Sequence, residues 1–171
     1  YAFVNKDVYI IMEYCEGSLE DSLLARGHFS EVDALKCALE IAEGLSKIHM
    51  QHWIHHDLKP ANVLIKHGHY KIADFGLVAH TSYLYGPKGG TPLYMAPEIV
   101  QELPYNHTVD LWSFGVILYE LFHGKPPFYT NNLYSLIQLI VKDPVKFPDN
   151  MGPEFKSFLK GLLNKAPSER L

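Results

Sequence analysis

Four polar residues follow one another in an order that could perform chemistry on a phosphate. Asp57 is followed by Lys59 two positions later and by Asn62 five positions later, and Asp74 comes shortly afterwards in Ala73-Asp74-Phe75-Gly76. A carboxylate can accept a proton from a hydroxyl, and a lysine can face a phosphoryl group. An amide oxygen and a second carboxylate can hold magnesium. These types in this order favour phosphoryl transfer from a nucleoside triphosphate.

Composition and charge narrow the classes of protein to which the chain can belong. Its 171 residues are 47% hydrophobic and 20% charged, which is typical of a globular domain with its own core. The formal net charge of -4 gives no electrostatic support to a nucleic-acid partner. No long uncharged apolar run predicts a membrane span, and no signal peptide is visible. Cys15 and Cys37 are the only cysteines, so we expect reduced thiols in a cytoplasmic protein.

Several histidines close together raise the question of a zinc site. Neither the Cys-x-x-Cys nor the His-Glu-x-x-His spacing of known zinc sites is present. Two of the histidines flank Gly68, which predicts the turn of a hairpin. We therefore favour ordinary structural positions over a zinc site for this group, which comprises His52, His55, His56, His67 and His69.

The first half of the chain has the patterns of one strand, one helix and one hairpin. Residues 7–14 are rich in β-branched and aromatic side chains, which predicts a strand. Ser30 can cap a helix, and Asp33 suits the positive end of that helix. Residues 63–65 and 70–72 predict a small hairpin. The apolar residues expected to form the core stripe of the helix are Leu35, Ala38, Ala42, Leu45 and Ile48.

The second half predicts a loop followed by three helices. Residues 81–90 are full of hydroxyls and glycines and contain a proline, which is typical of a mobile loop. Residues 110–122 are apolar nearly all round, which predicts a buried helix, and Gly124 is placed to end it. Residues 132–141 and 154–163 predict two amphipathic helices with a proline-rich connection between them.

Three motifs of this chain resemble those of eukaryotic protein kinases. Residues 55–62 are similar to the kinase catalytic loop, residues 73–76 to the magnesium-binding motif, and residues 91–98 to the substrate-docking segment. Lys59 after the aspartate and the run that starts at Gly90 have the serine/threonine pattern. The sequence from Gly90 onward also resembles the Fused kinase family.

The resemblance implies a fold and a domain organisation. We expect an α+β, mostly α, chain with the architecture of the kinase large lobe, a hinge and a remnant of the small-lobe sheet. Residues 1–171 would be a partial protein kinase domain. Within it, residues 1–16 would form the last small-lobe strand and the hinge, and residues 17–171 the large lobe, truncated at its C-terminal end.

The resemblance also implies roles for individual residues. Asp57 would be the catalytic base, Lys59 would meet the transferring phosphoryl group, and Thr91 would hydrogen-bond toward both. Asn62 and Asp74 would bind magnesium. The residues implied for nucleotide binding are Met12, Glu13, Cys15, Lys59, Asn62, Leu64 and Asp74. The implied structural contacts are those of Asp110 with the backbone of the catalytic loop, of Glu98 with Arg170, and of His55 with Phe75.

Two departures from the kinase pattern affect these expectations. His56 stands where an arginine usually grips a phosphate on the activation segment, and histidine has fewer donors and a pKa of about 6.5 in model peptides. Either activity is impaired, or the kinase needs no phosphate there. The 171 residues also contain no glycine-rich loop, strand lysine or partner glutamate helix. Either the chain is a fragment of a longer kinase, or the small lobe is genuinely lost. We favour the fragment, which alone would bind ATP poorly and be inactive.

Two functions from different classes remain. The first is an ATP-dependent serine/threonine protein kinase that uses magnesium, acts on a protein hydroxyl and has a regulatory protein partner. The alternative is a non-catalytic, pseudokinase-type binding module. The presence of Asp57, Lys59, Asn62 and Asp74 favours the first. Neither a nucleic-acid nor a membrane partner is expected.

Overall fold

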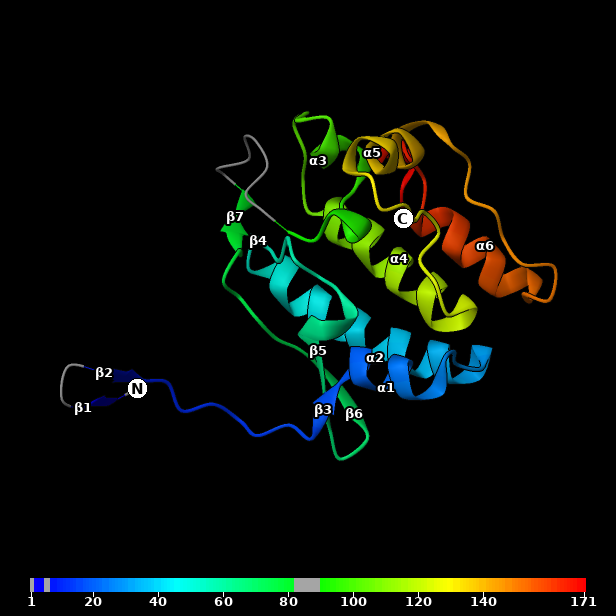
Figure 1. Ribbon diagram of the computed structural model, residues 1–171. Helices are drawn as coiled ribbons and strands as arrows, with labels where there is room; N and C mark the ends of the chain where they lie inside the picture. The colour runs from blue at the N-terminus through cyan, green and yellow to red at the C-terminus, as the bar shows by residue number, and fades with distance from the viewer. Residues whose placement is uncertain (1, 5–6, 82–89) are drawn as a thin grey trace.

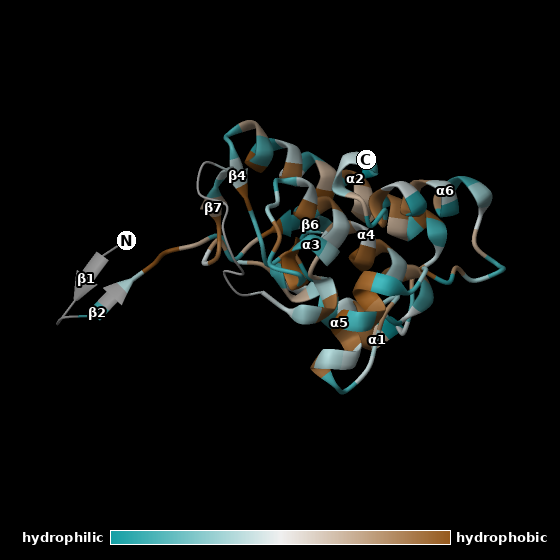
Figure 2. Cartoon of the chain, turned by 90° about the horizontal axis from the view of Figure 1, so that it is seen from above, coloured by the Kyte–Doolittle hydropathy of each residue, from teal (hydrophilic) through white to brown (hydrophobic). Residues whose placement is uncertain are grey.

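The computed structural model of the chain describes residues 2–4, 7–81 and 90–171. Helices make up most of the body, and short strands lie at its edge and near the N-terminus (Figure 1). Hydrophobic stretches run through the helices of the body and through the segment that follows the N-terminal strands (Figure 2). The mostly helical fold with small sheets is the one that the resemblance implies.

The first two strands form a hairpin apart from the body (Figure 1). Strand β1 (Ala2–Val4) pairs antiparallel with β2 (Asp7–Tyr9). The strand predicted over residues 7–14 is wrong beyond Tyr9, since residues 10–15 adopt no regular structure and pair with no strand in the described part of the chain. A strand is stable only where a neighbour completes its hydrogen bonds and covers its apolar face.

A three-stranded antiparallel sheet joins the end of this N-terminal segment to the body. Its order is β3 (Gly17–Ser18), β5 (Val63–Lys66) and β6 (His69–Ile72). His67 and Gly68 form the turn between β5 and β6, with φ of 50° and 76°. Two consecutive positive φ angles are typical of a tight two-residue hairpin turn. The predicted hairpin is therefore confirmed, and each of its strands extends one residue beyond the prediction toward the turn.

Helices α1 (Leu19–Arg26) and α2 (Glu31–Met50) follow. The N-cap prediction for α2 is confirmed, because the Asp33 amide donates to the Ser30 hydroxyl at 3.1 Å. The predicted stripe is wrong at two positions: Leu35 is 43% exposed, and Ala42 is exposed as well. The face that packs into the core is rotated relative to the prediction, so that its buried residues are Ala34, Cys37, Ala38, Ile41 and Leu45.

Helix α4 (Thr108–His123) forms the centre of the body, and most of its side chains are buried. Gly124 ends it in the left-handed conformation, with φ 79°. Helix α6 (Pro153–Leu162) packs against α4 so closely at Gly115 that an added Cβ would lie 2.9 Å from Cβ of Leu162. A larger residue at position 115 would therefore force the two helices apart.

The remaining elements complete the surroundings of the predicted site. Helices α3 (Pro97–Val100) and α5 (Leu133–Lys142) contact each other. Strand β4 (Trp53–Ile54) pairs with β7 (Ala79–His80). The loop predicted over residues 81–90 lies almost wholly outside the described residues. Short 3₁₀ turns are η1 (Pro60–Asn62), η3 (Pro92–Tyr94) and η4 (Pro167–Glu169).

Candidate active site

A buried carboxylate of α4 holds the backbone of the catalytic loop, residues 55–62. Asp110 is fully buried, and its two oxygens accept hydrogen bonds from the amides of His55 at 2.8 Å and His56 at 3.0 Å. Nε2 of His49, on α2, lies 2.8 Å from Oδ2 of the same carboxylate. The implied contact between Asp110 and the loop is therefore present, and it fixes the loop to the core.

Asp57 is the centre of a cluster of side chains from the catalytic loop and the segment after residue 90. Lys59 Nζ lies 2.9 Å from Oδ2 of Asp57, and the Asn62 amide nitrogen donates to the same oxygen at 3.0 Å. The Thr91 amide and hydroxyl donate to Oδ1 at 3.1 and 3.2 Å. Lys59 also donates to the Thr91 hydroxyl at 2.9 Å. The three predicted catalytic residues are thus brought together.

Thr91 can approach Asp57 because the preceding residue is a glycine. Gly90 has φ 117°, a conformation that residues with a side chain rarely adopt. A Cβ there would lie 3.1 Å from the His56 carbonyl oxygen and 3.2 Å from the Met95 methyl group. The glycine therefore allows close contact between the two segments.

Asp74 lies on the open side of the site. Its backbone has φ 62°, its side chain is exposed, and Oδ1 accepts a hydrogen bond from the Gly76 amide at 3.2 Å. The neighbouring Phe75 packs edge to face on the His55 ring, with 5.5 Å between the ring centroids. His55 Nε2 donates to the Ala73 carbonyl at 2.9 Å. The implied contact of His55 with Phe75 is present.

An open cavity of ≈ 710 Å³ lies between the N-terminal segment and the catalytic loop. Lys59 is not part of its lining; it lies with Thr91 beside Asp57. The cavity therefore brings together all but one of the residues predicted for nucleotide binding. The predicted residues in its lining are Met12, Glu13, Cys15, Asn62, Leu64 and Asp74.

Glu13 ties the irregular segment of residues 10–15 to the three-stranded sheet, a contact that no sequence pattern predicts. Its carboxylate lies 2.7 Å from Lys66 Nζ and 2.8 Å from Lys71 Nζ. Hydrogen bonds from Lys66 and then Lys71 lower the pKa of Glu13 to about 2. Glu16 adds a second tie, because its Oε2 accepts from the His67 amide at 2.8 Å. These contacts place one wall of the cavity.

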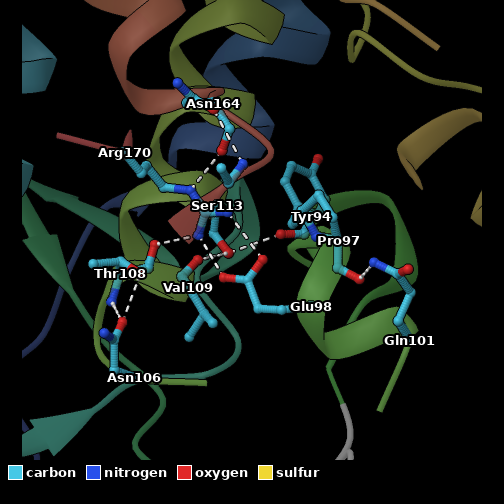
Figure 3. Close-up of polar contacts among 11 residues, drawn as sticks. Tyr94, Pro97, Glu98, Gln101, Asn106, Thr108, Val109, Ser113, Asn164 and Arg170 are labelled. Carbon is cyan, nitrogen blue, oxygen red and sulfur yellow. Dashed lines mark hydrogen bonds and ion pairs between the residues drawn. The ribbon is translucent and has the colours of Figure 1, made fainter. Parts of the chain in front are cut away.

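A buried ion pair holds the far end of the substrate-docking segment, residues 91–98. Arg170 donates to both oxygens of Glu98, at 2.6 and 2.9 Å, and to the Thr108 carbonyl at 3.0 Å (Figure 3). The implied pairing of Glu98 with Arg170 is therefore present. Figure 3 also shows Ser113 of α4 donating to the Tyr94 carbonyl, at 2.8 Å.

Tyr94 makes a second contact, which the sequence analysis did not predict. The Tyr94 hydroxyl donates to Oε2 of Glu120, on α4, at 2.6 Å. Burial raises the pKa of the Glu120 carboxyl. Tyr94 and Glu120 are far apart in the chain, and polar residues on an otherwise apolar helix are the only signal that could have indicated such a bond.

Two features of the described residues bear on other kinds of function. Across residues 2–4, 7–81 and 90–171, no three His, Cys, Asp or Glu side chains are grouped so that they could hold a metal ion. None of the helices in the described part of the chain is long and apolar enough to cross a membrane.

Comparison with known proteins identifies the family. The sequence profile described as protein kinase domain matches residues 2–171. The chain therefore belongs to the protein kinase family, as its motifs and its mostly helical fold indicate.

Several named serine/threonine kinases are similar to the chain. Serine/threonine-protein kinase TIO of Arabidopsis thaliana is 48% identical over 171 residues, which are 97% of this chain and 13% of that protein. Serine/threonine-protein kinase 36 of Mus musculus is 44% identical, over 98% of this chain and 13% of its own length. Serine/threonine-protein kinase fused of Drosophila melanogaster is 39% identical, over 96% and 21%. The predicted similarity to the Fused kinase is confirmed, and it extends over nearly the whole chain.

Proposed function

We propose that this chain carries the large-lobe half of the active site of an ATP-dependent serine/threonine protein kinase. The observation that supports this most strongly is the cluster around Asp57, in which Lys59, Asn62 and Thr91 all contact one carboxylate. Asp74 lies across an open cavity from the hinge. The names of the relatives agree with this proposal.

In the proposed reaction, a serine or threonine hydroxyl of a protein substrate attacks the terminal phosphorus of ATP. The bond to the bridging oxygen breaks, ADP leaves, and the hydroxyl proton passes to Asp57. Lys59 lies beside Asp57 and offsets the negative charge of the transferring group. Thr91 orients both side chains through its hydroxyl. These residues act mainly by positioning, which is what phosphoryl transfer requires.

Asn62 and Asp74 would hold the magnesium ion of the nucleotide. Nδ2 of Asn62 donates to the Asp57 carbonyl at 2.8 Å and to its carboxylate, so the amide oxygen is the atom left for a cation. Carboxylate and amide oxygens are suitable ligands for magnesium. Magnesium bound to the nucleotide supplies charge neutralisation of the phosphates. The adenine would meet the backbone of the hinge between Glu13 and Cys15, whose side chains line the cavity.

We also propose a cytoplasmic location and a regulatory protein partner. The location rests on the cysteines, both of which are free, with Cys37 buried. Burial raises the pKa of the Cys37 thiol to about 12, which keeps it protonated and unreactive. The relatives are much longer than the segment that matches, which leaves room for regulatory regions in those proteins.

The test is a phosphate-transfer assay on the full-length natural protein, with generic serine/threonine and tyrosine peptides and with magnesium present or chelated. We expect phosphate on serine or threonine only, no transfer without magnesium, and loss of transfer in Asp57→Asn. Nucleotide binding without any transfer would instead support the binding-module alternative. Transfer to tyrosine, or full activity in Asp57→Asn, would contradict the proposal.

A further inference from the structure

His56 occupies a strained and firmly held position next to the proposed catalytic base. Its backbone has φ 68°, in the left-handed region that residues with a side chain adopt uncommonly. Its amide is held by Asp110, and its carbonyl oxygen lies against Gly90. Strain of this kind persists only where the surroundings over-determine it, and it concentrates at functional sites.

The ring of His56 bridges two segments that are distant in sequence. Nδ1 lies 3.2 Å from the Leu77 carbonyl oxygen, and Nε2 lies 3.1 Å from the Tyr105 hydroxyl. A carbonyl can only accept, so Nδ1 carries a hydrogen, and in the neutral ring Nε2 accepts from the tyrosine. The Tyr105 ring packs edge to face on the His56 ring, with 5.4 Å between centroids. Both ring nitrogens are thus engaged.

Tyr105 provides a firm base for this bridge. Its side chain is buried in the core, in the connection that leads into α4. Burial raises the pKa of its hydroxyl, so it remains a donor at neutral pH. Tyr105 therefore holds the imidazole of His56 at Nε2, and Nδ1 of the same ring holds the Leu77 carbonyl, just after Gly76.

The two consecutive histidines hold carbonyls on either side of Asp74. His55 donates to the Ala73 carbonyl at 2.9 Å, and His56 donates to the Leu77 carbonyl at 3.2 Å. Asp74 itself is exposed, and its carboxylate accepts a hydrogen bond from the Gly76 amide. The position of that carboxylate therefore depends on how the backbone is held at these two ends.

We propose that His56 is a positioning residue for Asp74: supported by Tyr105, its ring fixes the Leu77 carbonyl and thereby the carboxylate that would bind magnesium on the nucleotide. The inference rests on the proposed kinase function. The arginine usual at this position grips a loop phosphate, and the inference gives His56 a role of another kind, in which its Nδ1 hydrogen holds the Leu77 carbonyl.

The test measures the magnesium dependence of nucleotide binding by calorimetry in the full-length natural protein, beside kcat and the KM for peptide. His56→Ala should raise the apparent magnesium constant about tenfold, the scale of one lost hydrogen bond. It should lower kcat and leave the peptide KM unchanged. His56→Asn keeps a donor near Nδ1 and tolerates positive φ, so it should recover most of the loss.

Two further variants separate positioning from folding. Tyr105→Phe keeps the ring and removes the hydroxyl, so it should shift the magnesium constant in the same direction by a smaller factor. His28→Ala removes an exposed histidine from the connection between α1 and α2, and should leave the constant unchanged.

Several outcomes would overturn the inference. An unchanged magnesium constant in both His56→Ala and Tyr105→Phe would do so, as would a His56→Asn variant as weak as His56→Ala. A wild-type protein that binds no magnesium nucleotide would remove the proposed function itself, and the inference with it.

Discussion

The buried pair of Glu98 and Arg170 gives the most quantitative prediction. The two side chains are 4% and 0% exposed, and two hydrogen bonds join them. Glu98→Ala would leave the guanidinium buried without its counter-charge. Two backbone carbonyls, of Thr108 and Asn164, would still accept from it. Removal of one partner from a buried pair costs about 3–5 kcal/mol, and we expect the lower end because of these carbonyls.

The assay is equilibrium unfolding of the full-length natural protein and its variants by urea and by heat. For a domain of this size, about 3 kcal/mol corresponds to a fall in the Tm of roughly 6–12 °C. The double variant Glu98→Ala/Arg170→Met should regain part of the loss, because no unpaired charge remains buried. Lys71→Ala is the matched control, since it breaks the exposed pair with Glu13 and should change stability little. A Glu98→Ala variant as stable as this control would refute the reasoning.

Four other predictions follow from the site. Asp57→Asn should lower kcat by about 10²–10⁴-fold with nucleotide affinity nearly unchanged, and a rate within about threefold of wild type would contradict its role as base. Asp74→Ala should abolish the magnesium dependence of nucleotide binding, which calorimetry with and without magnesium would detect. Asp110→Ala should cost about 1–3 kcal/mol in denaturant unfolding, because two buried amides of the catalytic loop lose their acceptor. Comparison of wild type with Glu13→Gln should show a small stability difference that is present above pH 4.5 and disappears as the pH falls toward about 2, since the folded-state pKa of Glu13 is depressed. A difference independent of pH would count against the lysine contacts.

Local sequence patterns predicted well those elements that depend on residues close together in the chain. Helix α4 is buried on nearly all sides, so an apolar run with a glycine at its end was enough to locate it. The β5–β6 hairpin was located from its turn, where Gly68 supplies a positive φ. The Asp57 cluster was anticipated because its members lie within one short loop, except Thr91, which only the family resemblance connected to it.

The features that were missed depend on neighbours distant in sequence. The predicted buried face of α2 was wrong at Leu35, which is exposed. Apolar residues occur on more than one face of that helix, and only packing selects the face that is buried. The strand predicted over residues 7–14 lacked a partner beyond Tyr9. The tie between Glu13 and the two lysines joins an irregular segment to a hairpin, and no local periodicity encodes such a contact.

The anchoring of the catalytic loop by Asp110 has a consequence for local unfolding. The loop amides of His55 and His56 are hydrogen-bonded to a fully buried carboxylate, so they should exchange with solvent only when α4 separates from the core. The Gly76 amide is held by an exposed carboxylate and should exchange through small openings. The proposed base should thus belong to the most stable cooperative unit, whereas the proposed metal-binding side should belong to a weaker one. Magnesium and nucleotide could then enter and leave through openings that do not disturb Asp57.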